Sequence, residues 1–205
     1  MDKAHNMYYV FSPVLRTRNN EIVQAKLVGS SPRIVPHWWE ATPLTATLPL
    51  LTFTVKREWS LPDNLFTGTI FDLYSIGLIE VLVHAGIDFE TFPAVVTDKS
   101  GEDLNVRYEI FHLLEKRPCL DSEKSKTDDD ALEIRKLVLS EEFMSLRKPM
   151  VRVEEVSEIV LVHKDLKNLI EKKGITGCNF TPVSKYQSGL RFYFRNQKGK
   201  PTESS

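Results

Sequence analysis

The sequence predicts an α+β fold with a mostly antiparallel sheet and short helices, arranged as two related halves. Runs of β-branched and aromatic residues outnumber the helical segments, which favours a sheet-rich protein. The regular alternation of strand and helix that marks a parallel α/β fold is not visible in the chain. A pattern of apolar residues followed by a Gly-Ile pair occurs twice, at a spacing of 88 residues. This spacing predicts an internal duplication.

The predicted strands are short apolar runs separated by proline, glycine and polar residues. Leu51, Phe53 and Val55 alternate with Thr52 and Thr54, which is the period of a half-buried strand. The same criteria select the ranges 7–11, 21–28, 50–56, 105–113, 132–139 and 189–194.

The repeat begins as a helix with one apolar face. The first copy places Tyr74, Leu78, Val81 and Leu82 at the i, i+4, i+7, i+8 spacing of such a face. Adding 88 to each number gives Val162, Leu166, Leu169 and Ile170. Gly86 and Gly174 suit the left-handed position that ends a helix. We therefore expect strand, short helix, glycine stop and strand in residues 71–96 and again in residues 159–184.

The residues before the two helices differ. Ser75 is a good N-cap residue, whereas His163 at the same position of the second copy is a weaker one. We expect His163 to lie at the surface. The whole of residues 1–195 is predicted to form one domain, and residues 196–205 are predicted to be a frayed tail.

Composition excludes several classes of protein. The 205 residues carry 27 Lys and Arg against 28 Asp and Glu, a net charge of −1, so no excess of basic residues predicts nucleic-acid binding. The longest apolar stretch, around residues 76–83, is too short to cross a membrane, and the N-terminus lacks a signal-peptide pattern. Two isolated cysteines, Cys119 and Cys178, favour reduced thiols in a cytoplasmic protein.

Catalytic signatures are missing from the sequence. It contains no phosphate-binding loop, no dinucleotide-binding glycine motif and no Gly-x-Ser-x-Gly elbow. No two of the five histidines have the i, i+4 spacing of a metal-binding helix. His112 and Cys119 would form a nucleophilic pair only if they met in space; otherwise we expect a packed cysteine and an exposed histidine. The sequence thus predicts no enzyme, no metal and no cofactor.

Two local features are candidates for binding a partner. Trp38 and Trp39 are adjacent, so either one ring lies in the core and the other covers a loop, or one faces a partner. Residues 121–133 hold six acidic residues and two lysines. This segment is either a solvated loop or a docking site for a basic partner through Asp128, Asp129 and Asp130.

Several motifs occur in the order found in a known family. The repeat contains Ile159-Val160-Leu161-Val162, Leu166 and Gly174-Ile175-Thr176-Gly177, followed by Phe180 and Pro182. Earlier in the chain stand Tyr8-Tyr9-Val10, Leu61-Pro62-Asp63, and Leu120-Asp121 with Ser125. Together these motifs resemble a family of bacterial immunity proteins of polymorphic toxin systems, often numbered eleven. His163 departs from the serine that the family carries there.

The resemblance implies a cytoplasmic protein that binds a cognate toxin, neutralises it in a stoichiometric complex, and so serves in bacterial competition. It implies neither catalysis nor a cofactor. Two alternatives stay open: a regulatory or scaffold module that binds another protein, and an enzyme with a cryptic site that uses His112, Cys119 or the acidic segment. The sequence does not predict an oligomeric state.

Overall fold

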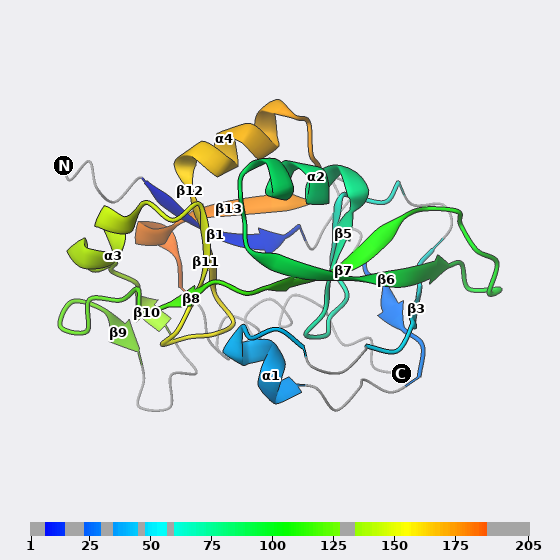
Figure 1. Cartoon of the computed structure of the whole chain (residues 1–205), viewed down its shortest axis with the longest axis horizontal. Coiled ribbons are helices and arrows are strands. Elements are labelled where there is room, and N and C mark those ends of the chain that lie inside the picture. The colour runs from blue at the N-terminus through cyan, green and yellow to red at the C-terminus, as the bar shows by residue number, and fades with distance from the viewer. Residues whose placement is uncertain are drawn as a thin grey trace, which may run out of the picture.

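The computed structural model describes residues 7–14, 23–29, 35–44, 48–56, 60–127 and 134–187. The predicted strand 189–194, the predicted tail 196–205 and the acidic residues Asp128, Asp129 and Asp130 lie outside this description. Within it, strands predominate and the four α-helices have six to nine residues each. The α+β class with a mostly antiparallel arrangement is confirmed (Figure 1).

The larger sheet has six strands in the order β2-β3-β6-β7-β5-β4. All neighbours are antiparallel except β3 and β6. Its strands are β2 (Lys26–Leu27), β3 (Leu51–Thr54), β4 (Asn64–Leu65), β5 (Asp72–Ser75), β6 (Phe89–Thr97) and β7 (Tyr108–Leu113).

The second sheet has five strands in the order β13-β1-β12-β11-β8, with only β8 and β11 parallel. Its strands are β1 (Tyr8–Pro13), β8 (Lys116–Arg117), β11 (Met150–Val153), β12 (Val160–His163) and β13 (Cys178–Pro182). A separate pair consists of β9 (Lys126–Thr127) and β10 (Ile134–Lys136). Each predicted strand that falls in the described part of the chain is confirmed; β1 extends to Pro13, beyond the predicted range, and the other strands are shorter than predicted.

The helices are α1 (Val35–Glu40), α2 (Ile76–His84), α3 (Glu141–Leu146) and α4 (Lys164–Lys172), with a 3₁₀ turn at Val183–Lys185. Helices α2 and α4 lie side by side on one face of the molecule, and α1 lies on the opposite side (Figure 1). Within the described ranges, no helix is both long enough and apolar enough to span a membrane.

The two predicted units have the same element order. Adding 88 to the bounds of β5 and α2 reproduces the bounds of β12 and α4. Gly86 and Gly174 follow the helices with φ of 69° and 70°, a left-handed conformation that suits glycine. In both units the residue after the glycine donates its N–H to the carbonyl five residues back, as in a Schellman cap. The common origin of the two units stays a prediction.

Each unit has a split arrangement of its strands. The two strands flanking the helix are separated by a third strand that is antiparallel to both. In the first half that strand is β7, which follows the unit directly. In the second half it is β1, from the other end of the chain. The second half therefore needs the N-terminal residues to complete its sheet.

Two expectations about the repeat are wrong. Tyr74 and Val162 lie in strands β5 and β12 instead of on a helical face, because extended backbone at Ser75 and His163 delays the start of each helix. His163 is not at the surface either: it is 7% exposed and caps α4 with its imidazole.

Three groups of buried side chains hold the layers together. One, which includes Phe53 and Trp38, lies between the larger sheet and α1. A second, which includes Tyr8 and Phe143, lies between the smaller sheet and α3. The third joins the two halves beneath α2 and α4 and includes Leu82. Aromatic and branched residues on alternate strand positions, together with Trp38 of α1, thus cover both faces of each sheet.

Candidate functional site

The two adjacent tryptophans of α1 have different surroundings. Trp38 has no exposed surface; its ring stacks on His112 with a centroid distance of 4.4 Å and contacts the edge of Phe71 at 5.0 Å. Successive helical side chains point about 100° apart, so the neighbour faces elsewhere. The prediction that Trp38 contacts a partner is therefore wrong for this fold, because its ring is enclosed by the core.

Trp39 keeps part of its surface exposed and covers a buried cation. The guanidinium carbon of Arg152 lies 5.2 Å from the centroid of the Trp39 ring, within the range of a cation–π contact. This contact holds the indole at the surface. Trp39 as a partner contact stays a prediction.

Arg152 is the central charged residue of this region. It extends from β11, is only 4% exposed, and donates from Nη1 to the carbonyl oxygen of Ser157 at 2.6 Å. Burial lowers the pKa of Arg152, while the nearby Asp72 and Tyr74 raise it. The guanidinium on the smaller sheet is thus electrostatically coupled to Asp72 and Tyr74 on the larger sheet.

Asp72 is the acidic partner of Arg152 across the two sheets. It lies on β5, and burial raises the pKa of its carboxyl from 3.8 to about 6, although Arg152 opposes this increase. The carboxyl is surrounded by protein even though the residue keeps some exposed surface. Asp72 and Arg152 form an electrostatic connection between the halves.

A histidine and a carboxylate lie next to this connection, on the side of α1. His112 of β7 and Glu90 of β6 are register partners, and His112 Nδ1 lies 3.5 Å from Glu90 Oε2. That distance is too long for a strong hydrogen bond. Glu90 Oε2 instead accepts the N–H of Leu44 at 3.0 Å. Burial lowers the pKa of His112 and Glu90 opposes this effect, so the imidazole is neutral at pH 7.

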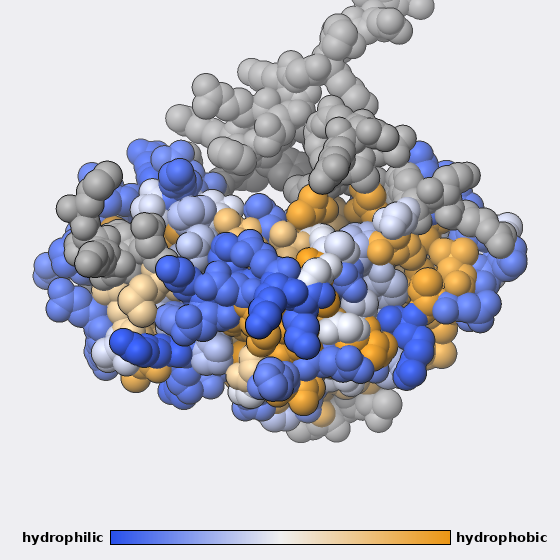
Figure 2. All heavy atoms as spheres, turned by 90° about the horizontal axis from the view of Figure 1, so that it is seen from above, coloured by the Kyte–Doolittle hydropathy of each residue, from blue (hydrophilic) through white to orange (hydrophobic). Residues whose placement is uncertain are grey.

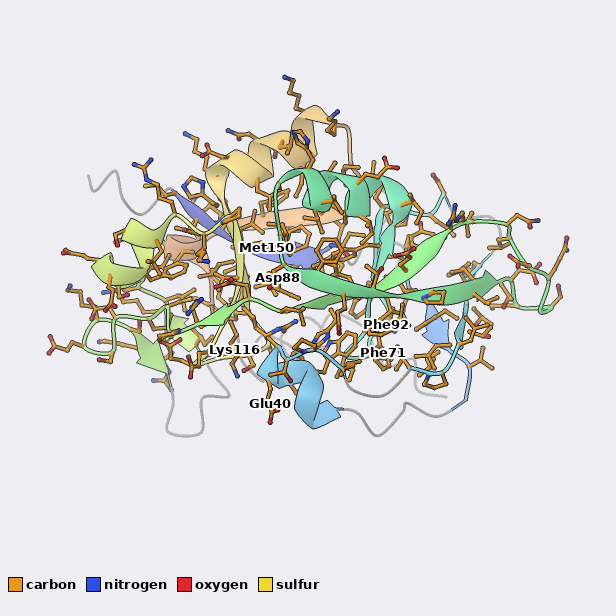
Figure 3. The ribbon with its side chains drawn as sticks, viewed as in Figure 1. Glu40, Phe71, Asp88, Phe92, Lys116 and Met150 are labelled. Carbon is orange, nitrogen blue, oxygen red and sulfur yellow. The ribbon has the colours of Figure 1, made fainter. Side chains whose placement is uncertain are left out.

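We name this group of five residues the Arg152 cluster: Trp38, Trp39, Asp72, His112 and Arg152. In Figure 3, α1 with Glu40 lies below the two sheets, with Lys116 on one side and Phe71 and Phe92 on the other. Several buried nitrogens of the cluster lack a hydrogen-bond partner among the described residues: Trp38 Nε1, both ring nitrogens of His112, and Arg152 Nε. The cluster joins α1 and both sheets at one place.

The geometry of the described residues does not form the nucleophilic pair considered from the sequence. His112 has no exposed surface, so the expectation of an exposed histidine is wrong, and its closest ring neighbour is Trp38. Cys119 belongs to the core group that includes Tyr8 and Phe143, between the smaller sheet and α3. Burial, followed by the charges of Glu155 and Glu154, raises the pKa of Cys119 far above its usual value. A thiol held protonated at pH 7 is a poor nucleophile.

Two motifs of the family resemblance meet in space. Asp63 Oδ2 accepts the N–H of Thr176 at 2.7 Å and its hydroxyl at 2.8 Å, and Thr176 Oγ1 accepts the N–H of Asp63 at 3.2 Å. Next to this pair, a Cβ added to Gly177 would lie 2.5 Å from Pro62 and 2.6 Å from the carbonyl oxygen of Asn64. Only glycine fits this approach. The Leu-Pro-Asp and Gly-Ile-Thr-Gly motifs therefore connect the halves.

The third motif forms the base of the acidic segment. Asp121 Oδ1 accepts the N–H groups of Glu123 and Lys124, and its Oδ2 pairs with Lys124 Nζ at 2.7 Å. Ser125 Oγ exchanges hydrogen bonds with both backbone groups of Val138. These contacts position the two ends of the segment. The predicted contacts Asp128, Asp129 and Asp130 lie between them, outside the described residues.

Arg152 and Asp72 were missed as candidates from the sequence. Both carried a signal, because each is a charged residue within an otherwise apolar run, Met150–Val153 and Phe71-Asp-Leu-Tyr. Charged residues in buried strands require a partner of opposite charge. The sequence does not show which two runs lie together, and this information comes only from the topology.

In the described part of the chain, no group of three or more His, Cys, Asp or Glu side chains is placed to hold a metal ion. No protein-family model matches the chain, and no curated protein shows significant sequence similarity to it.

Proposed function

We propose that this protein is a cytoplasmic immunity protein that binds a cognate bacterial toxin and neutralises it in a stoichiometric complex. The observation that carries the proposal is the way in which the motifs of the resemblance fit together. Asp63 and Thr176, from two of them, share three hydrogen bonds across 113 residues. Motifs that are far apart in the chain but interlock in space are expected for one shared framework.

The residues of these motifs contact other parts of the fold, so we assign them a structural role and not a role in binding the partner. Asp121 and Ser125 bind local backbone groups, and Gly177 permits the close approach of Pro62. A family whose shared residues hold the fold can vary its surface freely, which suits proteins that each meet a different toxin. Trp39 and the segment that contains Asp128, Asp129 and Asp130 are the surface features that we assign to the toxin.

The experiment is co-expression with the toxin encoded by the neighbouring gene. We expect growth to be rescued and the two proteins to co-purify in a fixed ratio. Rescue should persist in Cys119→Ser and His112→Asn, because neither side chain is given a catalytic role. Trp39→Ala should weaken the complex, whereas Leu146→Ala, at a residue that is 51% exposed on α3, is the control and should not.

The result also separates the alternatives. An enzyme that destroys the toxin or its product would rescue growth at a small fraction of the toxin's concentration, without a stable complex. A regulatory or scaffold module would neither rescue growth nor bind this toxin. Loss of rescue in folded Cys119→Ser would contradict the proposal and favour the enzyme.

A further inference from the structure

Helix α1 has only six residues, yet it is fixed at both ends of its contact with the larger sheet. Trp38 lies in the core and stacks on His112 of β7 with a centroid distance of 4.4 Å. After the helix, Leu44 donates its N–H to Glu90 Oε2 of β6 at 3.0 Å. A helix this short is not stable alone in water, so these contacts hold it in place. The backbone that carries Trp39 therefore has a fixed position.

The side chain of Trp39 is held by the other sheet. The guanidinium carbon of Arg152, on β11, lies 5.2 Å from the centroid of the Trp39 ring. Arg152 is itself fixed, because it donates from Nη1 to the carbonyl oxygen of Ser157, in the loop between β11 and β12, at 2.6 Å. Asp72 supplies the opposite charge that a buried guanidinium requires. A cation withdrawn from water interacts more strongly with an indole, so Arg152 is a rigid support for this ring.

Trp39 can be reached only from the side of the molecule that carries α1. That helix lies on the side away from α2 and α4 (Figure 1), and the exposed Glu40 next to Trp39 lies below both sheets in Figure 3. Figure 2 looks down on the opposite face, which carries α2 and α4 and where hydrophobic and hydrophilic residues are interspersed. A toxin that contacts Trp39 therefore approaches the α1 side.

An exposed ring that is already ordered is well suited to binding. Ordering a large side chain at an interface opposes association, and a side chain that is ordered in the free protein avoids this loss. We infer that Arg152 is a positioning residue for toxin binding, which fixes Trp39 in the orientation that the toxin contacts. This inference rests on the proposed function. Because Arg152 is only 4% exposed, its effect on the toxin has to pass through the indole.

The variants separate the contact with Trp39 from the charge balance of the core. Arg152→Met alone would leave Asp72 without its partner, so the test uses the double variant Arg152→Met, Asp72→Asn, in which neither side chain is charged. The matched control is Asp72→Asn, which keeps Arg152 and its contact with the ring. We expect the double variant to dissociate from the toxin encoded by the neighbouring gene roughly threefold to tenfold faster than the control.

A cycle with Trp39 distinguishes positioning from a general structural effect. In the Trp39→Ala background, exchanging Asp72→Asn for the double variant should leave dissociation unchanged, because there is no ring to fix. An equal increase in both backgrounds overturns the inference. Equal dissociation rates of the double variant and its control, with Trp39 present, overturn it as well.

Tryptophan fluorescence follows the same ring without the toxin. The part of the acrylamide quenching that disappears in Trp39→Phe reports on Trp39. It should increase in the double variant relative to Asp72→Asn, and unchanged quenching contradicts the inference alone. A wild-type chain that does not bind the toxin contradicts the proposed function, and with it the role of Arg152 in binding.

Discussion

Ser75 and His163 cap equivalent helices with different chemistry. Ser75 Oγ accepts the N–H of Leu78 at 3.2 Å, and His163 Nδ1 accepts the N–H of Asp165 at 3.3 Å. The imidazole also packs against the ring of Tyr8, with a centroid distance of 5.1 Å. A bulkier residue therefore serves as both cap and core residue in the second half.

This relationship predicts a measurable cost for losing the imidazole. His163→Ala should lower the free energy of unfolding by about 1–2 kcal/mol through the lost cap. His163→Asn supplies a side-chain oxygen in its place and should recover part of that loss. Urea denaturation of both variants is the measurement. Equal stability of the His163→Ala and His163→Asn variants would mean that the cap contributes nothing.

Asp63 should contribute to stability in a way that depends on pH. Burial alone would raise the pKa of Asp63, but hydrogen bonds from Ser75 and Thr176 outweigh it and hold the pKa below 3.8. Because the folded pKa is the lower one, this stabilisation is present above pH 3.8 and is lost as the pH falls through the folded value. Asp63→Asn should lower the free energy of unfolding by about 1–3 kcal/mol at pH 7, because the new NH₂ group would face the hydrogen-bond donors of Ser75 or Thr176.

The control for Asp63 is Asp103→Asn, since the amide oxygen of asparagine can still accept the N–H of Asn105 as Asp103 does. It should change stability by less than about 0.5 kcal/mol. A loss of the same size in both variants would show that the contact between Asp63 and Thr176 has no special role.

Asp72 should make stability change with pH in the opposite direction from Asp63. Its pKa is raised by burial to about 6 in the folded protein, against 3.8 for the ordinary group. The folded state therefore binds more protons in this interval, and stability should fall as the pH rises from about 4 to about 6. Asp72→Asn removes this titration and should flatten the profile. Chemical denaturation at several pH values checks it, and an unchanged slope in the variant would contradict the assignment.

The buried sides of α2 and α4 should contribute to stability as core residues do. Leu82 is fully buried and Ile170 is 1% exposed, and both belong to the group that joins the halves. Leu82→Ala or Ile170→Ala should each cost about 2–5 kcal/mol, the range for truncating a buried aliphatic residue. Thermal or urea unfolding gives the value. Costs below about 0.5 kcal/mol would place these residues outside the core.

The acidic residues should affect the speed of toxin binding. Replacing Asp128, Asp129 and Asp130 together by Asn should slow association about tenfold or more at low salt, as for lost electrostatic steering. Stability should barely change. Binding kinetics at two ionic strengths provide the comparison, and an unchanged association rate at both would remove this segment from the interface.

The local pattern of the sequence was enough to predict the repeated unit. Glycine at positions 86 and 174 marks the helix ends, because a left-handed residue is needed there. The start of each helix was less predictable: Tyr74 continues the apolar spacing backwards, and only the backbone at Ser75 shows that a strand precedes it. Local periodicity identifies an element more reliably than its boundary.

The candidate site depended on contacts that no local pattern contains. Arg152 and Asp72 lie 80 residues apart on different sheets, and His112 lies beneath a tryptophan of α1. His163 was misplaced for a related reason, since a polar residue is expected outside unless its buried partners are known. The adjacency of the two tryptophans did separate one core ring from one partly exposed ring.

The position of β1 has a consequence for folding during synthesis. Tyr8 pairs with His163, so the ribosome makes this strand 155 residues before its neighbour. At about 5–20 residues per second, the delay is roughly 8–30 s. The strands of the larger sheet are synthesised close together in time, whereas β1 has no partner strand until β12 has been made. Strand β1 can therefore be captured only after β12 has been translated, so the smaller sheet is completed later than the larger one.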